Sequence, residues 1–240
     1  MANPTILIVP GSFSSPGAYD GVVALLRKQG FPAFAVQLPS TQKRMPLEPA
    51  TMQDDASVIR RAAEALIGLG REVVVLCHSY GGTPTTEGLA GLAVKRIIYL
   101  SAIVPKVGQT HIAAMELPEG FLPEVVGGYM HIDAIQMAPA ILNDMPFEEA
   151  YPHTLTLQHH SAVSFNAPVT QAAYETIPVT YLLCEKDLVV APETQKRFIS
   201  VLGEGGRKVD VVGLQSGHCP NWSQPEKLVE VLVEAAEKGV

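Results

Sequence analysis

The chain of 240 residues is 47% hydrophobic and carries a formal net charge of −7. This apolar content suffices for the core of one large domain, or of one domain with a sizeable insertion. Because the acidic balance leaves no basic surface for phosphate backbones or anionic lipids, we predict neither nucleic-acid nor membrane partners.

The cysteines and the first residues indicate a reducing compartment. Cys77, Cys184 and Cys219 are odd in number and far apart, without CxxC spacing, which argues against disulfides and a zinc site. The start, MANPTILIVPGS, has one short apolar run and no basic residues, unlike a signal sequence. We therefore predict a soluble, cytoplasmic protein without a bound metal.

Short apolar runs alternate with longer stretches of helical periodicity. Uninterrupted apolar runs are typical of strands that are buried on both faces of a parallel sheet. They predict an α/β fold whose mostly parallel six-stranded sheet is flanked by helices. The expected strands are Thr5–Val9, Ala33–Gln37, Glu72–Cys77, Lys95–Ser101, Val179–Cys184 and Lys208–Val212.

Two of the helical stretches carry end signals. Thr51 precedes the first, and Asp54 three positions later makes a variant capping box. Ser223 precedes the second, where Glu226 completes a Ser-x-x-Glu box and Gly239 is the expected stop. We predict a helix after each of these capping residues.

The alternation stops for nearly eighty residues between Ser101 and Val179. This interval is rich in Pro, Gly, Met and aromatic residues, with weak helical patterns at 131–142 and 168–177. A structureless loop of that length is improbable within a compact domain. We therefore predict a small helical cap insertion at about residues 105–170, within a single domain of residues 1–240.

The segment VVVLCHSYGGTP, residues 73–84, contains a candidate nucleophile. Ser79 follows a predicted buried strand, and Gly81 and Gly82 precede a helical stretch. A sharp strand-to-helix turn needs small residues two positions before and two after the nucleophile. Cys77 stands where glycine is usual, and we interpret it as a small-residue replacement.

A serine nucleophile needs a general base and an acid that orients the base. Asp187 follows the fifth predicted strand and His218 the sixth, at the sheet edge where parallel strands end. Glu185 is a less suitable acid because it is closer to the strand end, and Asp210 because it lies within a strand. The predicted catalytic residues are Ser79, Asp187 and His218.

Attack on a carbonyl also requires donors for the developing oxyanion. One expected donor is the backbone N–H of Tyr80, directly after the nucleophile. The other comes from the segment PGSF, where Gly11 lets the chain turn and Ser12 presents its N–H. Phe13 is the alternative donor if this loop is shifted by one residue.

Three segments, HSYGG, LLCEKDLVVAPETQ and SGHCPNWSQPEKL, resemble those of the α/β-hydrolase superfamily. The pattern is most similar to the small plant methylesterase and hydroxynitrile lyase group and its microbial relatives. The resemblance implies an α/β-hydrolase fold with a Ser-His-Asp triad. Pro10 and Cys77 depart from the family pattern, which often has histidine and glycine there. Hydroxynitrile lyases of the group carry threonine and lysine at the positions of Gly11 and Cys219, so cyanohydrin cleavage is disfavoured.

Other histidines have plainer interpretations. His78 is interpreted as a packing residue, because consecutive side chains diverge at the elbow. His153, His159 and His160 have no carboxylate or cysteine at ligand spacing, so we interpret them as exposed or packing residues rather than metal ligands.

The insertion contains adaptable methionines and aromatic residues, which are typical of an apolar pocket. The predicted substrate-binding residues are Phe13, Met115, Met130, Met137 and Phe147. An ordinary core of a small cap explains the same composition. Both interpretations hold if the underside of the cap forms the pocket wall.

These features predict a serine hydrolase that cleaves a carboxyl ester or lactone of a small apolar molecule through an acyl-enzyme, without a cofactor. Two alternatives stay open. The same residues could hydrolyse a carbon–carbon bond of a β-diketone or polyketide-like substrate, or the fold could serve as a non-catalytic small-molecule receptor. A homodimer is compatible with the sequence.

Overall fold

A computed structural model describes residues 2–116 and 122–238. Its main feature is a six-stranded sheet of order β2-β1-β3-β4-β8-β9, in which all neighbouring strands are parallel. The six predicted strand positions are confirmed, with ends that differ by no more than two residues. The strands are β1 (Thr5–Val9), β2 (Ala33–Ala35), β3 (Val73–His78), β4 (Arg96–Leu100), β8 (Val179–Cys184) and β9 (Val209–Leu214).

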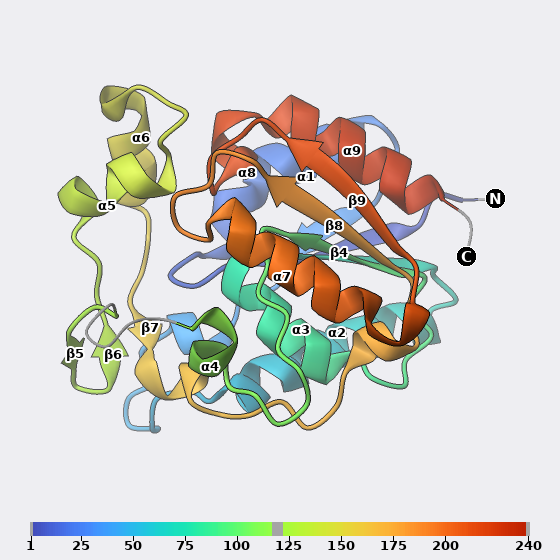
Figure 1. The fold of residues 1–240 in the computed structure, drawn as a ribbon, viewed down its shortest axis with the longest axis horizontal. Coiled ribbons are helices and arrows are strands. Elements are labelled where there is room, and N and C mark those ends of the chain that lie inside the picture. The colour runs from blue at the N-terminus through green and yellow to red at the C-terminus, as the bar shows by residue number, and fades with distance from the viewer. Residues whose placement is uncertain (1, 117–121, 239–240) are drawn as a thin grey trace.

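Helices cover both faces of this sheet (Figure 1). One face packs against α1 (Asp20–Lys28) and α9 (Pro225–Glu237), and the other against α2 (Met52–Gly68), α3 (Gly82–Gly88) and α7 (Pro192–Gly203). Along β1, Ile6 and Ile8 enter the first core, whereas Leu7 and Val9 enter the second. This two-sided burial explains the uninterrupted apolar runs in the sequence.

Of the two predicted helix starts, the one at Thr51 is confirmed and the one at Ser223 is not. Thr51 and Asp54 form the expected capping box at the start of α2. The prediction for Ser223 was wrong, because this residue ends the short helix α8 (Pro220–Ser223) and its hydroxyl donates to Asp144 at 2.8 Å. Helix α9 begins two residues later. Gly239 lies outside the described residues.

In its described residues, the chain between β4 and β8 forms three α-helices and a small second sheet. The helices are α4 (His111–Met115), α5 (Ala134–Ile141) and α6 (Phe147–Thr154). The antiparallel strands, in the order β5-β6-β7, are β5 (Val125–Val126), β6 (Tyr129–Met130) and β7 (His160–Ser161). The pattern at 131–142 forms α5, whereas the one at 168–177 forms only the 3-10 turn Ala173–Glu175.

Helices α5 and α6 lie beyond the end of the sheet toward which the strand arrows point (Figure 1). The candidate residues Ser79, Asp187 and His218 follow β3, β8 and β9 in sequence, so they belong to the same end of the sheet. Further 3-10 turns lie at Pro16–Tyr19, Pro39–Thr41, Ser79–Gly81, Ala162–Phe165 and Glu204–Gly206. Within the described ranges, no helix has both the length and the hydrophobicity that a membrane crossing requires.

Candidate active site

Ser79 stands at a sharp turn between β3 and α3. Its φ of +52° is in the left-handed region, which a residue with a side chain adopts only where the surrounding structure enforces it. Gly81 allows the turn to form, because a Cβ there would lie 2.6 Å from the carbonyl oxygen of Pro10. The predicted elbow is therefore present.

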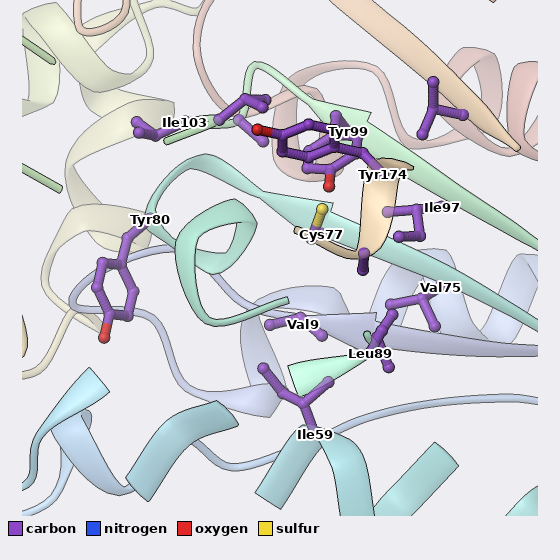
Figure 2. Packing of buried hydrophobic residues seen from close by; sticks show 14 of the residues in the cluster. Val9, Ile59, Val75, Cys77, Tyr80, Leu89, Ile97, Tyr99, Ile103 and Tyr174 are labelled. Carbon is purple, nitrogen blue, oxygen red and sulfur yellow. The ribbon is translucent and has the colours of Figure 1, made fainter. Parts of the chain in front are cut away.

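Cys77 fits the elbow because its side chain points into the core of the sheet. Figure 2 shows its sulfur within the core beside Tyr99, while the Tyr80 side chain lies apart. The thiol is 3.6 Å from the carbonyl oxygen of Ile98, and burial raises its pKa. Cys77 is thus a core residue at a position that admits a Cβ, in line with the small-residue interpretation.

The structure brings Ser79, His218 and Asp187 into one hydrogen-bonded series. His218 Nδ1 lies 2.7 Å from Asp187 Oδ2, and His218 Nε2 lies 3.1 Å from Ser79 Oγ. All three side chains are buried. Because a carboxylate only accepts hydrogen bonds, Nδ1 carries the proton and Nε2 is left to accept one from the serine hydroxyl.

The Asp187 carboxylate is held on both oxygens. Oδ1 accepts the backbone N–H groups of Val189 and Val190 at 2.7 and 2.9 Å, and Oδ2 accepts the Ser101 hydroxyl as well as His218. Burial raises the pKa of the carboxyl, but His218 and the hydrogen bonds outweigh it and hold the pKa below its usual value. Asp187 is therefore an ionised partner for His218.

Two residues that support Asp187 were not predicted from the sequence. Ser101 directly follows β4, and its hydroxyl donates to Asp187, which follows the neighbouring strand β8. Gln195 of α7 is buried, and its amide donates to Val190 O at 2.7 Å while its oxygen accepts the Cys184 N–H at 2.9 Å. It thereby fixes the loop that carries Asp187.

His78 has a more specific role than packing. Its Nδ1 lies 2.7 Å from the Tyr19 hydroxyl and its Nε2 lies 2.9 Å from the His218 carbonyl oxygen. Burial lowers the pKa of His78 to about 3, so the ring is neutral. The ligand atoms of His78, His218 and Cys219 lie within 4.8 Å of one another, but all four ring nitrogens are occupied by hydrogen bonds within the protein. A metal there would have to displace them.

The loop at Gly11–Ser14 lies opposite the elbow. Phe13 has a φ of +62°, and its N–H donates to His160 Nδ1 at 3.3 Å. Because this N–H is already used, Ser12 is the better candidate for the loop's oxyanion donor. The Tyr80 side chain points away from the nucleophile, and its hydroxyl donates to Asp55 at 2.7 Å. Tyr80 is the second residue of the 3-10 turn Ser79–Gly81, and the first N–H groups of a helical turn have no acceptor within it.

Comparison with known proteins identifies the family. The model of a family described as "Alpha/beta hydrolase family" matches residues 6–231. This chain belongs to the alpha/beta hydrolase family. The fold expected from the sequence is thereby confirmed.

The alpha/beta hydrolase has relatives that match it along nearly its whole length. It is 54% identical over 242 residues to "Probable hydrolase R7" of a Phoma species, covering 98% of this chain and 99% of the relative. It is 27% identical to "Pyrethroid hydrolase" of Sphingobium wenxiniae, over 97% of this chain and 87% of the relative. The crystal structure of polyneuridine aldehyde esterase superposes with a TM-score of 0.80 at 19% identity, covering 98% and 100% of the two chains. That likeness concerns the fold.

A small cavity of about 80 Å³ adjoins Ser79 and His218 of this alpha/beta hydrolase. Apart from the loop residues, Ser79 and two histidines, its wall is apolar. The lining residues are Gly11, Ser12, Phe13, Ser14, His78, Ser79, Ile132, Met137, Ile141, Leu157, Val189, His218 and Cys219. Larger surface hollows, of about 350 and 560 Å³, are lined by none of the residues Ser79, Asp187 and His218.

Two of the five predicted substrate-binding residues lie at the cavity. Phe13 and Met137 line the cavity. The other three do not line it: Met130 is fully buried in the core, Met115 packs against that core, and Phe147 is 47% exposed on α6. The composition of the insertion does not reveal which of its faces turns toward Ser79.

Proposed function

We propose that this alpha/beta hydrolase cleaves a carboxyl ester or lactone of a small apolar molecule through an acyl-enzyme on Ser79. The observation that carries the proposal is the buried series Ser79–His218–Asp187, which borders an apolar cavity. A receptor has no need for a nucleophile, base and acid in hydrogen-bonded order. The intact series therefore favours an enzyme.

The proposed reaction has two steps. Ser79 Oγ attacks the ester carbonyl while His218 Nε2 takes the hydroxyl proton, and the N–H groups of Ser12 and Tyr80 stabilise the oxyanion. His218 then gives the proton to the departing alcohol. Water attacks the acyl-enzyme with His218 again as the base, releasing the acid and regenerating Ser79. Asp187 orients the ring and stabilises its protonated form.

The cavity supports a short, uncharged acyl group. Its wall is formed by Ile132, Met137, Ile141, Leu157 and Val189, which offer no charged partner. Its volume of about 80 Å³ is far below the roughly 300 Å³ at which sites for drug-sized ligands begin. The name of the pyrethroid hydrolase relative also supports ester cleavage.

The test compares substrates and one variant. Purified wild type and Ser79→Ala are assayed with p-nitrophenyl acetate, butyrate and decanoate, a γ-lactone and a β-diketone. We expect turnover of the short esters, declining with acyl length, and a loss of at least about 10⁴-fold in kcat for Ser79→Ala. Ser200→Ala, an exposed serine on α7, is the matched control and keeps its activity.

The other outcomes decide between the alternatives. Turnover confined to the β-diketone would replace ester hydrolysis by carbon–carbon bond hydrolysis. If no substrate is turned over and a short ester still binds, the receptor interpretation holds instead.

A further inference from the structure

A segment of the insertion holds the loop that carries one proposed oxyanion donor. The backbone N–H of Gln158 donates to the Phe13 carbonyl oxygen at 2.7 Å, and the Phe13 N–H donates to His160 Nδ1 at 3.3 Å. Both peptide groups of Phe13, which has a left-handed backbone, are thus bonded to the chain just before and within β7. The loop conformation therefore depends on residues about 145 positions later in the chain.

The hydrogen bonds around His160 determine its tautomer. The Ser164 hydroxyl donates to the Ser161 carbonyl oxygen at 2.8 Å, so its oxygen is free to accept from His160 Nε2, 3.0 Å away. His160 Nε2 thus carries the proton, and Nδ1 presents a lone pair to the Phe13 N–H. The ring is fully buried, and burial lowers its pKa well below the usual value. It therefore remains the neutral acceptor that this bond requires.

The same ring also contacts the second oxyanion segment. The rings of His160 and Tyr80 meet edge to face, with centroids 4.7 Å apart and planes at 77°. The far end of Tyr80 is fixed by its hydrogen bond to Asp55. Tyr80 directly follows Ser79, and its backbone N–H is a proposed oxyanion donor. Contacts that hold the Tyr80 side chain therefore also restrict the position of this N–H. One imidazole from the insertion thus touches both sides of the proposed oxyanion hole.

We infer that His160 is a positioning residue for the oxyanion hole, whose Nδ1 fixes the Phe13 peptide beside Ser12 and whose ring braces Tyr80. The inference rests on the proposed hydrolase function and adds a residue to it. Oxyanion donors act only when their geometry is set before the reaction. Loss of the Nδ1 acceptor should therefore weaken transition-state binding more than substrate binding.

Three variants separate the hydrogen bond from packing. His160→Phe keeps a ring but removes the acceptor, whereas His160→Asn places an amide oxygen near the position of Nδ1. The matched control is His111→Phe, because His111 is also buried and contacts the Tyr80 ring at 5.3 Å, but it bonds to Thr83 instead of the loop. All three are measured for kcat and KM with a short ester, and for inhibition by a trifluoromethyl ketone that forms an oxyanion on Ser79.

The expected result is a selective loss. His160→Phe should lower kcat by about 10- to 100-fold with KM changed less than about threefold, and weaken trifluoromethyl ketone inhibition in parallel. His160→Asn should recover most of this loss, and His111→Phe should stay within about threefold of wild type. Unchanged kcat in folded His160→Phe, or equal losses in His160→Phe and His111→Phe, would overturn the inference.

A spectroscopic measurement covers the case in which His160→Phe does not fold. In the ¹⁵N spectrum of the wild type at neutral pH, His160 should show a protonated Nε2 and an unprotonated Nδ1, coupled across the hydrogen bond to the Phe13 amide. A protonated Nδ1 overturns the inference. Absence of ester hydrolysis by the wild type overturns the proposed function as well, whereas hydrolysis without an effect at His160 overturns only the positioning role.

Discussion

At the scale of single residues, the Asp187 carboxyl shows how hydrogen bonds and a neighbouring histidine can hold a buried carboxyl pKa below its usual value. Its two oxygens accept hydrogen bonds from backbone groups, His218 and Ser101. Ser101 and His218 share Oδ2, and Ser101 Oγ is also 3.5 Å from His218 Nδ1. Ser101 therefore limits where the carboxylate and the imidazole can move.

Removal of the Ser101 hydroxyl should lower kcat. Ser101→Ala takes one donor from Oδ2, and we expect kcat to fall about tenfold with little change in KM, since a hydrogen bond to a charged group contributes about 1.5–3 kcal/mol, part of which orients His218. Steady-state kinetics with a short ester measures the effect.

A glycine variant provides the control for backbone strain at this position. Ser101 has a φ of +40°, which Ser101→Gly accommodates without strain. It should lose as much activity as the alanine variant. Wild-type kcat in both variants would contradict a role for this hydroxyl.

At the scale of elements, the linker between α5 and α6 joins the insertion to two loops of the triad. The Asn143 amide donates to the carbonyl oxygen of Lys186 at 2.9 Å, and Asp144 Oδ2 accepts the Gly217 N–H at 2.8 Å. Lys186 precedes Asp187 and Gly217 precedes His218. One short linker thus holds both loops, although it lies more than forty residues away from either in sequence.

Truncation of Asp144 should loosen the His218 loop. Its Oδ2 also accepts the Ser223 hydroxyl, so Asp144→Ala removes several hydrogen bonds to one carboxylate. We expect a loss of about 2–3 kcal/mol in the free energy of unfolding and a kcat reduced about tenfold or more, as measured by urea titration and ester kinetics.

The control for this prediction lies in the same part of the insertion. Asp133 caps α5 by accepting the N–H groups of Ile135 and Gln136. Asp133→Ala should therefore cost about 1 kcal/mol of stability with kcat unchanged. If both aspartate variants lower kcat to the same extent, the linker has no special connection to the triad.

The elements differ in how well the sequence predicts them. Strands β1 and β8 are predicted to the residue because burial on both faces produces an unbroken apolar run. The two-residue strands β5, β6 and β7 are too short for any periodicity. Ser223 resembles an N-cap in the local sequence, but its hydroxyl bonds to Asp144, a contact that only tertiary structure creates.

At the scale of the whole molecule, sheet order explains why the candidate triad could be predicted and the pocket could not. Ser79, Asp187 and His218 follow β3, β8 and β9, whose carboxyl ends meet at one edge of a parallel sheet. No comparable rule predicts how the segment between β4 and β8 packs over the sheet. Whether Met130 or Met137 faces Ser79 depends on how the insertion packs, which the residue pattern does not encode.

The buried Asp55 should make the stability of the molecule depend on pH. Burial raises the pKa of this carboxyl from 3.8 to about 6, although hydrogen bonds from Ser40 and Tyr80 oppose the rise. Because the pKa of Asp55 is higher in the folded than in the unfolded chain, protonation of Asp55 favours the folded state. This contribution to the free energy of unfolding is present below pH 3.8 and is lost as the pH rises to about 6. At about 1.4 kcal/mol per pKa unit, the loss is about 3 kcal/mol.

The variant Asp55→Asn isolates this contribution because it cannot ionise. Urea titrations of both proteins between about pH 4 and pH 7 should show wild type losing about 2.4 kcal/mol relative to the variant as pH rises, because part of the full contribution is already lost at pH 4. Parallel pH profiles for the two proteins would mean that Asp55 has an ordinary pKa.

The proposed reaction requires Ser79 to be a nucleophile activated by His218 and Asp187. Its most direct test is intact-protein and peptide mass spectrometry after reaction of the native protein with a fluorophosphonate. We expect one adduct, located on Ser79, absent in Ser79→Ala and formed at least about 100-fold more slowly in His218→Ala. No adduct on native protein, or one on another residue, would contradict it.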